Sequence, residues 1–414
     1  MSTARYLIGD VFERMAEIPD GSVDLVVTSP PFLALRSYLP ADHPDKHKEI
    51  GSETTPAAFI DTLLALSTEW RRVLAPHGSI CVELGDTYSG SSATGGDFKP
   101  EGEWTKYKRG DLGAVSTTRR SGDAWPLDKS LSGIPTLYAW SIAYGRNLLN
   151  PATTCDPWRI RNLLVWARPN SFVGALGDKW RPATSYVTVA CVGRQRYFDL
   201  DAVRTPVQHP DKKATAGFRE DGSRRIKSVT YDASESAGAP PLDWCDERDL
   251  AWQPLMPLPT QPYAGSHYAT FPTQLPKRLI ECMSPQRVCT VCGKPSERIT
   301  SEPEYVDRAG LAPSQTWQTG VGGVSSSRKA VDNGGMRRIV ETLGWTDCGH
   351  DSYRPGHILD PFGGSGTTAV AATGLGRDCT LIDLDARNAD LARERIGPMF
   401  FEHRTVDELW PGAA

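Results

Sequence analysis

The 414-residue sequence lacks several features that define particular classes of protein. No apolar run approaches the ~18 residues that cross a bilayer, so we expect no membrane segment. Residues 1–5 lead directly into a strand-like segment without the apolar stretch of a secretory signal, so we expect a cytoplasmic protein. Most of the nine cysteines lie singly in apolar segments, which argues against a disulfide framework.

The sequence also lacks an excess of positive charge. Its formal net charge is -4, so no global basic field indicates a nucleic-acid partner. Lysine and arginine nevertheless cluster within two polar segments, 106–120 and 212–227. Solvated loops would explain these clusters as well as contacts to phosphates would, and both interpretations stay open.

Strand-like and helical segments alternate along the chain. Three short apolar segments read as strands: Tyr6–Ile8, Val23–Val27 and Ser79–Leu84. A helical pattern begins at Thr55, which is followed by proline, and we expect it to stop at His77-Gly78. Residues 357–396 read as strand, glycine-rich turn, helix, strand and helix. The alternation predicts an α/β fold with a doubly wound, mostly parallel sheet.

The glycine-rich turn of the final block has the composition of a nucleotide site. It reads D-P-F-G-G-S-G-T-T over residues 360–368. Small residues let the backbone approach a ligand, and free N–H groups at a helix start favour electron-rich atoms. The Gly-Lys-Ser/Thr of a P-loop is missing, which disfavours a triphosphate. Asp383 ends the next strand and could accept both hydroxyls of a ribose, so a nucleoside-bearing cofactor is indicated unless the turn is purely structural.

A second unusual turn follows the apolar segment 22–27 and reads Thr28-Ser29-Pro30-Pro31-Phe32. Ser29 precedes a proline and is therefore biased toward an extended conformation, and Pro30 is constrained in the same way. Two backbone carbonyls are thus fixed beside a flat ring. The pattern predicts a binding site for a planar, nitrogen-containing group. The structural alternative is a rigid end to the strand, with the aromatic ring of Phe32 filling space in the core.

Together the two turns resemble the motifs of the amino-methylating DNA methyltransferases that use S-adenosylmethionine. Residues 360–366 resemble the cofactor motif and residues 28–32 the catalytic motif, and this order resembles the β group of the family. Gly9-Asp10 and the segment 265–280 resemble further elements of the family. Val187 departs from the pattern, because related chains often have an acidic residue there.

The resemblance implies a Rossmann-like methyltransferase sheet that methylates an exocyclic amine of a base flipped out of double-stranded DNA. It implies that the base is held by Ser29, Pro30, Pro31 and Phe32, with the ring of Phe32 stacked on it. The cofactor-binding residues that it implies are Asp10, Phe271, Pro272, Asp360, Pro361, Phe362, Gly364, Ser365, Gly366, Thr367 and Asp383. It places the enzyme in a restriction-modification setting, where a cognate restriction endonuclease is a candidate second partner.

The first residue of the catalytic tetrad bears on the target base. In the family, Asp-Pro-Pro-Tyr accompanies adenine N6, and Ser-Pro-Pro-Tyr or Ser-Pro-Pro-Phe usually accompanies cytosine N4. The resemblance therefore predicts cytosine N4, with adenine N6 as the alternative. Methylation at cytosine C5 is excluded, because it needs a cysteine nucleophile, normally in Pro-Cys, and the chain has no such dipeptide. An inactive DNA-binding regulator on the same scaffold is the alternative of a different class, and an RNA or protein substrate is a lesser one.

Two cysteine-containing turns have the spacing of a metal site. Cys289 and Cys292 form a Cys-x-x-Cys turn followed by glycine, and Cys348 and His350 flank Gly349. Two such pairs suit a tetrahedral structural zinc with three sulfur ligands and one nitrogen ligand. The alternative is reduced cysteines in loops. A redox role is disfavoured, because no thioredoxin-like pattern surrounds Cys289.

These expectations divide the chain into catalytic, recognition and metal-binding segments. The predicted segments are 1–88 (catalytic half of the methyltransferase domain), 89–135 (insertion and DNA-contact loop), 136–204 (rest of the catalytic half), 205–262 (candidate target-recognition region), 263–283 (cofactor-flanking element), 284–356 (zinc-binding insertion) and 357–414 (S-adenosylmethionine-binding half). The irregular segments carry the basic clusters, so we expect DNA recognition by inserted loops and a small zinc-binding lobe.

Overall fold

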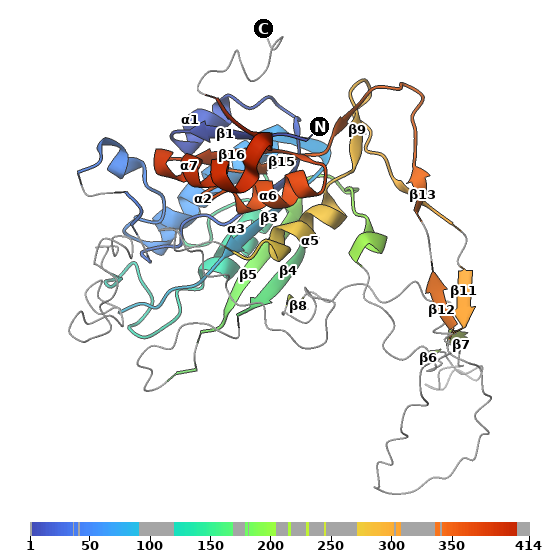
Figure 1. The fold of residues 1–414 in the computed structure, drawn as a ribbon. Coiled ribbons are helices and arrows are strands. Elements are labelled where there is room, and N and C mark those ends of the chain that lie inside the picture. Colours follow the sequence, from blue (N-terminus) through green and yellow to red (C-terminus); the bar gives the residue numbers. More distant parts are fainter. Residues whose placement is uncertain are drawn as a thin grey trace, which may run out of the picture. The chain divides into compact units, whose positions relative to one another are not determined.

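The computed structural model describes most of the chain (Figure 1). The described residues are 2–35, 37–39, 42–90, 120–168, 179–180, 182–203, 214–216, 229–231, 244–245, 271–301, 304–307, 336–339 and 342–403. They belong to two units: residues 1–199, 242–296 and 347–414 form the larger unit, and residues 200–241 and 297–346 form the smaller one. Most of the predicted segments 89–135 and 205–262 lies outside the described residues, and their expected role in DNA recognition stays a prediction.

The larger unit is built on a nine-stranded sheet with the order β17-β1-β16-β15-β2-β3-β5-β4-β8. Its strands are β1 (Ala4–Ile8), β2 (Val23–Thr28), β3 (Leu74–Leu84), β4 (Arg159–Ala167), β5 (Thr184–Cys191), β8 (Trp244–Cys245), β15 (His357–Asp360), β16 (Asp378–Asp383) and β17 (Phe400–His403). Every neighbouring pair is parallel except the two pairs that include β5. The predicted α/β fold with a mostly parallel sheet is confirmed.

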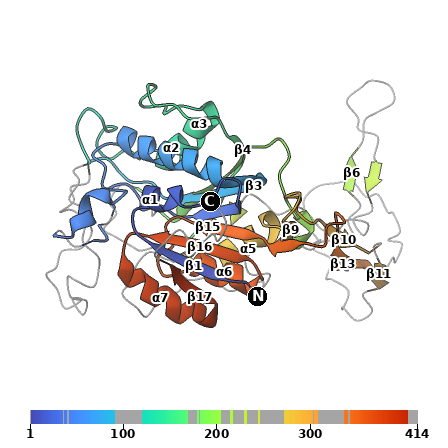
Figure 2. The same cartoon turned by 90° about the horizontal axis from the view of Figure 1, so that it is seen from above.

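Helices cover both faces of this sheet. They are α1 (Val11–Ala16), α2 (Pro56–Val73), α3 (Ile134–Tyr144), α5 (Gln274–Met283), α6 (Thr367–Gly374) and α7 (Ala386–Ile396). Figure 2 shows α1, α2 and α3 on one face and α5, α6 and α7 on the other. Because both faces are covered, β2 is buried along its whole length, which is why it reads as a continuous apolar run around Asp24.

Helix α2 forms where its cap and apolar spacing predict. The Thr55 side chain accepts a hydrogen bond from the backbone N–H of Ala58, and Pro56 occupies the first turn. The predicted stop at His77-Gly78 was wrong, because the helix ends at Val73. Leu74 already pairs with Val23 of β2, so strand pairing ends the helix before the glycine is reached.

The parallel strands bring several carboxyl ends to one edge of the sheet. Strand β15 lies between β16 and β2. From β2 the chain continues to β3 on one side, and from β15 it passes through α6 to β16 on the other side. The gap between β15 and β2 is therefore the topological switch point at which doubly wound sheets bind their ligands.

The remaining elements are short. In the larger unit, β9 (Arg287–Cys289) pairs antiparallel with β14 (Tyr353–Pro355), and two 3-10 turns span Pro44–Lys48 and Gly397–Met399. The smaller unit contains a 3-10 turn at Leu200–Val203 and three two-stranded ladders: β6 (Ala214–Ala216) with β7 (Val229–Tyr231), β10 (Arg298–Thr300) with β13 (Thr342–Trp345), and β11 (Glu304–Asp307) with β12 (Met336–Ile339). Among the described residues, no helix combines the length and apolar character needed to cross a membrane.

A buried carboxylate connects the central strand to β14. Asp24 of β2 has no exposed surface, and its oxygens accept hydrogen bonds from Arg354 at 2.6 and 3.1 Å. His77 Nε2 lies 2.9 Å from the carboxylate, and the backbone N–H of His357 donates to it at 2.7 Å. Burial raises the pKa of Asp24, but the hydrogen bonds and charges of His77 and Arg354 outweigh this and hold the pKa below its ordinary value.

We predict that Asp24→Asn destabilises the protein by roughly 3 kcal/mol, because it removes the negative charge of a buried ion pair and leaves Arg354 without its counterion. The matched control is Asp390→Asn, which breaks a surface pair with Arg393 and should change stability by less than about 0.5 kcal/mol. Urea unfolding at neutral pH measures both. Because the folded-state pKa of Asp24 is lowered, the wild-type advantage is present above the ordinary pKa of aspartate and lost as the pH falls through the lowered value. Equal effects of the two substitutions would contradict this role for Asp24.

Candidate functional site

A cavity of about 120 Å³ lies at the switch point between β15 and β2. Its lining includes Ser29 and Pro31 from the end of β2 and Phe271 from before α5. The rest of the described lining is Gly9, Asp10, Val11, Tyr38, Leu39, Lys48, Glu49, Ile50, Asp360, Pro361, Phe362, Gly363, Gly364, Ser365, Thr367, Ile382, Asp383, Leu384, Asp385 and Asn388. The two turns that the sequence analysis singled out therefore line the same cavity, although they lie near opposite ends of the chain.

Asp360 ties these two turns together. Its buried carboxylate accepts hydrogen bonds from the hydroxyl of Thr28 at 2.7 Å and from the hydroxyl of Thr368 at 2.6 Å. The backbone N–H of Phe362 donates to the same carboxylate at 3.1 Å. Burial raises the pKa of Asp360 to about 6, and these hydrogen bonds oppose the rise only in part. The side chain thus holds the end of β2 against the start of the glycine-rich turn.

Asp383, at the end of β16, fixes the other side of the glycine-rich turn. Its carboxylate accepts hydrogen bonds from the backbone N–H groups of Gly364 and Asp385, both at 2.8 Å, and from the side chain of Asn388 at 3.0 Å. Burial raises the pKa of Asp383 to about 6, and these hydrogen bonds oppose the rise. Gly364 has a φ of 48°, in the left-handed region, and its carbonyl accepts from the Tyr6 hydroxyl at 2.7 Å. Both polar groups of this glycine are therefore fixed.

Not every predicted cofactor residue reaches the cavity. Pro272 and Gly366 are absent from its lining. A Cβ atom at Gly366 would lie 3.0 Å from Cβ of Ala392 and 3.1 Å from the end of Ile396, so this glycine permits the close packing of α7. Asp10 does line the cavity, and its side chain also caps α1 by accepting two backbone hydrogen bonds.

Only some of the predicted catalytic residues line the cavity. Ser29 and Pro31 line the cavity, whereas Pro30 and Phe32 are not among the lining residues. The Phe32 ring packs on Gly85 just after β3, where a Cβ atom would lie only 2.4 Å from Cε2 of the ring. Phe32 is half-buried and contacts the main hydrophobic core beside the cavity.

Glu83 is a residue of this site that the sequence analysis missed. It lies on β3 with 4% of its surface exposed, and its Oε2 accepts a hydrogen bond of 2.5 Å from the Ser29 hydroxyl. Burial raises the pKa of Glu83 above its ordinary value despite this hydrogen bond. An acidic residue within the otherwise apolar segment Ser79–Leu84 was the available signal.

The cavity wall formed by Tyr38, Leu39, Lys48, Glu49 and Ile50 was also not anticipated. The buried carboxylate of Glu49 accepts hydrogen bonds from the backbone N–H groups of Tyr38 and Leu39, which fixes the shape of this segment. Lys48 forms ion pairs with Glu13 of α1 and with Asp45. No sequence motif marks the segment.

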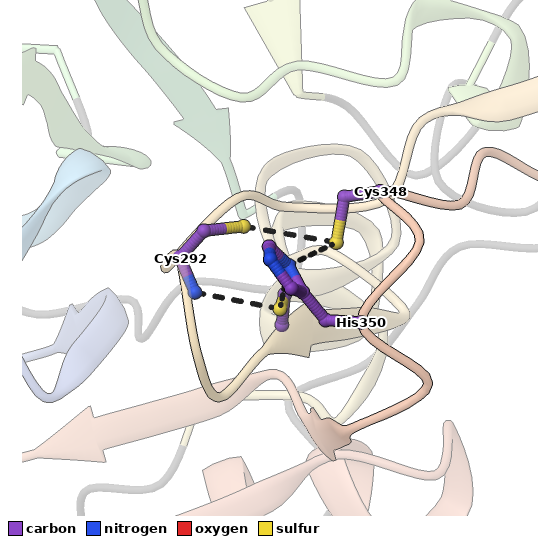
Figure 3. A group of neighbouring side chains, drawn as sticks. Cys292, Cys348 and His350 are labelled. Carbon is purple, nitrogen blue, oxygen red and sulfur yellow. Dashed lines mark hydrogen bonds between the residues drawn. The ribbon is translucent and has the colours of Figure 1, made fainter.

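The predicted metal ligands come together in the larger unit. The ligand atoms of Cys289, Cys292, Cys348 and His350 all lie within 4.8 Å of one another. Figure 3 shows Cys292, Cys348 and His350 converging from two turns. Three thiols and an imidazole are the donor set of many structural zinc sites, so these residues could hold a metal.

Comparisons with known proteins match most of this chain to DNA methyltransferases. The family model described as DNA methylase matches residues 23–289 and 351–394. The Type II methyltransferase M.SmaI of Serratia marcescens is 23% identical over 399 residues, which cover 96% of this chain and 91% of the relative. The Type II methyltransferase M.Cfr9I of Citrobacter freundii is 27% identical over 267 residues, which cover 64% of this chain and 68% of the relative.

A solved structure, the PvuII DNA methyltransferase (cytosine-N4-specific), aligns with 95% of this chain and 86% of its own at 13% identity and a TM-score of 0.47. The family model matches well over half of the sequence, on both sides of the switch point. The chain belongs to the DNA methylase family.

Proposed function

We propose that the protein is a site-specific methyltransferase that moves a methyl group from S-adenosylmethionine to the exocyclic N4 amine of a cytosine in double-stranded DNA. The observation that carries this proposal is the shared cavity, which Ser29 and Pro31 line together with the 360–367 turn and Asp383. A donor bound against the turn would lie next to the residues proposed to hold the base. Membership of the DNA methylase family supports DNA as the substrate.

The charges of the cavity fit this cofactor. Five carboxylates line it, namely Asp10, Glu49, Asp360, Asp383 and Asp385, and Lys48 is the single cation among the described lining residues. Two of the carboxylates are already paired, Glu49 with Lys46 and Asp385 with Arg387. Such a lining suits a cationic sulfonium and opposes a polyphosphate. We propose that Asp383, at the carboxyl end of β16, accepts a ribose hydroxyl at the acceptor site of Oδ2 that its three protein hydrogen bonds leave open. When bound, the cofactor supplies an electrophilic methyl group on sulfur.

The Ser29 turn is suited to activating an aromatic amine. The lone pair of such an amine is delocalised into the ring, so attack requires the nitrogen to pyramidalise. Acceptors aimed at its N–H groups favour that change. Because the Ser29 hydroxyl donates its own proton to Glu83, the lone pairs of Ser29 Oγ remain available to accept from the amine. The backbone carbonyls of Ser29 and Pro30 are further acceptors whose positions the two prolines restrict.

Glu83 provides a destination for the proton that the methylated amine must lose. We propose that this proton passes to Ser29 Oγ while the Ser29 hydroxyl proton passes to Glu83 Oε2, along the 2.5 Å hydrogen bond. The raised pKa of Glu83 makes its carboxylate a stronger base than an ordinary glutamate. The neutral serine of the tetrad is thus hydrogen-bonded to a carboxylate that can take up its proton.

The family resemblance of the Ser-Pro-Pro-Phe tetrad favours cytosine N4, and adenine N6 is the alternative in the same site. The named relatives are Type II methyltransferases, so we propose a restriction-modification setting with a cognate endonuclease as partner and DNA-bound enzyme in the cytoplasm. A catalytically inactive regulator is disfavoured by the joined cavity and the Ser29–Glu83 pair. We also propose that a structural zinc ion binds to Cys289, Cys292, Cys348 and His350.

The product identifies the reaction directly. Duplex DNA incubated with the full chain and methyl-labelled S-adenosylmethionine is digested to nucleosides, and we expect the label in N4-methylcytosine. Label in N6-methyladenine would replace the proposed base while leaving DNA methyl transfer intact. Absence of label, although the cofactor and DNA bind, would support the inactive regulator instead.

Replacing the proton acceptor tests the Ser29–Glu83 pair. We predict that Glu83→Gln and Ser29→Ala each lower kcat by about 10²–10⁴-fold, with little change in cofactor affinity, because general acid–base catalysis contributes at that scale. Glu69→Gln, a surface substitution beside Arg72, is the control and should leave kcat unchanged. In the wild-type enzyme, kcat should fall as the pH drops through the raised pKa of Glu83, because the proton-accepting form is lost. Full activity of Glu83→Gln would refute the relay.

Cofactor affinity should depend on the ionisation of Asp383. Binding favours the ionised carboxylate, so we predict that the affinity measured by calorimetry falls as the pH drops below about 6, the raised pKa of this group. Asp383→Asn should weaken binding roughly tenfold or more at neutral pH, because hydrogen bonds to charged groups contribute about 1.5–3 kcal/mol. It should also remove most of the pH dependence. Unchanged affinity in this variant would show that Asp383 does not hold the cofactor.

A further inference from the structure

We propose that Cys289, Cys292, Cys348 and His350 bind one structural zinc ion that fixes strand β14 and the arginine with which it anchors β2. The inference is independent of which base the enzyme methylates. All four residues belong to the larger unit, two before and two after residues 297–346, which belong to the smaller unit.

Three of the six distances between donor atoms match the edges of a zinc tetrahedron, and all six lie within 4.8 Å. Zn–S bonds of about 2.3 Å and Zn–N bonds of about 2.0–2.1 Å give tetrahedral edges of about 3.8 Å between two sulfurs and about 3.5 Å between sulfur and nitrogen. The Sγ atoms of Cys292 and Cys348 are 3.7 Å apart. His350 Nδ1 lies 3.5 Å from Sγ of Cys289 and 3.3 Å from Sγ of Cys348. A disulfide would require about 2.05 Å between sulfurs, so the two thiols are not bonded to each other.

The backbone around the cluster is arranged for thiolate ligands. The N–H groups of Val291 and Cys292 point at Sγ of Cys289, at 3.4 and 3.5 Å, which stabilises negative charge on that sulfur. Gly293 and Gly349 have φ values of 68° and 82°, so each turn bends through the left-handed region. Both pairs of ligands thus sit in tight turns that direct their side chains to one point (Figure 3).

A hydroxyl supports the second pair of ligands. The Tyr353 hydroxyl lies 3.5 Å from Sγ of Cys348 and accepts a hydrogen bond from the Cys348 N–H at 3.1 Å. It also donates to Asp347 at 2.7 Å. Such contacts around the first ligands orient them and tune the metal.

Few apolar side chains are buried around these two turns. Cys292 and His350 are exposed, and the neighbouring Val291 has 66% of its surface exposed, so apolar burial contributes little here. A bound metal would supply the missing free energy, as it does in other small metal sites. It would also close the loop formed by residues 293–347, an ordering that costs chain entropy.

Strand pairing connects the Cys/His cluster to the central sheet. Tyr353 on β14 pairs with Cys289 on β9, and Arg354 pairs with Val288. Arg354 then donates to the buried carboxylate of Asp24, the second residue of strand β2, which ends at Thr28 just before Ser29. Zinc therefore holds the short β9–β14 pair in place, and this pair presents Arg354 to the central sheet.

Metal content of the full chain tests the proposal without any substitution. Protein purified without chelators should contain one zinc per chain by elemental analysis. Replacement by Co²⁺ should give the visible absorption of tetrahedral cobalt bound by thiolates. Metal-free folded protein that takes up no Co²⁺, or a Cys292–Cys348 disulfide found by mass spectrometry of unreduced peptides, would overturn the proposal.

Three substitutions then assign the ligands. Cys348→Ser should lose the metal, whereas His350→Cys, which keeps four ligands, should retain it. Cys155→Ser removes a thiol outside the cluster and should retain the metal. Stripping the metal with a chelator should lower the thermal midpoint of the wild type but not that of Cys348→Ser. Metal retained by Cys348→Ser, or a wild-type midpoint that does not respond to the chelator, would contradict the assignment. If Cys348→Ser does not fold, the wild-type metal content and cobalt spectrum decide.

Discussion

The hydrogen bond from Thr28 to Asp360 is the contact on which the site depends. It joins the last residue of β2 to the last residue of β15, 332 positions away in the chain, at a distance of 2.7 Å inside the protein. A buried carboxylate is unfavourable unless its oxygens are paired, and here two hydroxyls and a backbone N–H satisfy it. Because the two strands are neighbours and parallel, this contact brings the Ser29 turn and the glycine-rich turn to one cavity.

The two sides of that cavity supply different chemistry. The turn after β15 and the end of β16 present carboxylates and fixed backbone groups, which suits a cationic cofactor with a ribose. The end of β2 presents oxygen acceptors, and behind Ser29 lies the buried Glu83 of β3. In this account the sheet edge separates binding of the methyl donor from activation of the amine, with a distance between them that is set by the spacing of adjacent strands.

Much of this arrangement could be predicted from the sequence, because it depends on local patterns. Alternating strands and helices predicted the parallel sheet, and each of the two turns was expected to follow an apolar strand. The cysteine pairs predicted a cluster that the structure assembles. These patterns are readable since strand ends, prolines and glycines constrain the backbone where they occur.

The features that could not be predicted depend on tertiary contacts. Glu83 becomes a partner of Ser29 only because β3 lies beside β2; the sequence shows an acidic residue within an apolar strand but does not reveal its partner. The role of Gly366 in admitting α7 and the packing of Phe32 on Gly85 depend on chain segments that the local sequence does not reveal. The end of α2 was misplaced for the same reason, because pairing of Leu74 with Val23 overrides the local glycine signal.

The most direct test of the central claim is a crystal structure of the full chain bound to S-adenosylhomocysteine, the demethylated cofactor. We expect a ribose hydrogen-bonded to Asp383 and a sulfur atom that faces Ser29 across the cavity, next to the hydrogen bond between Thr28 and Asp360. A cofactor bound elsewhere, or one whose sulfur is separated from Ser29 by protein, would contradict it.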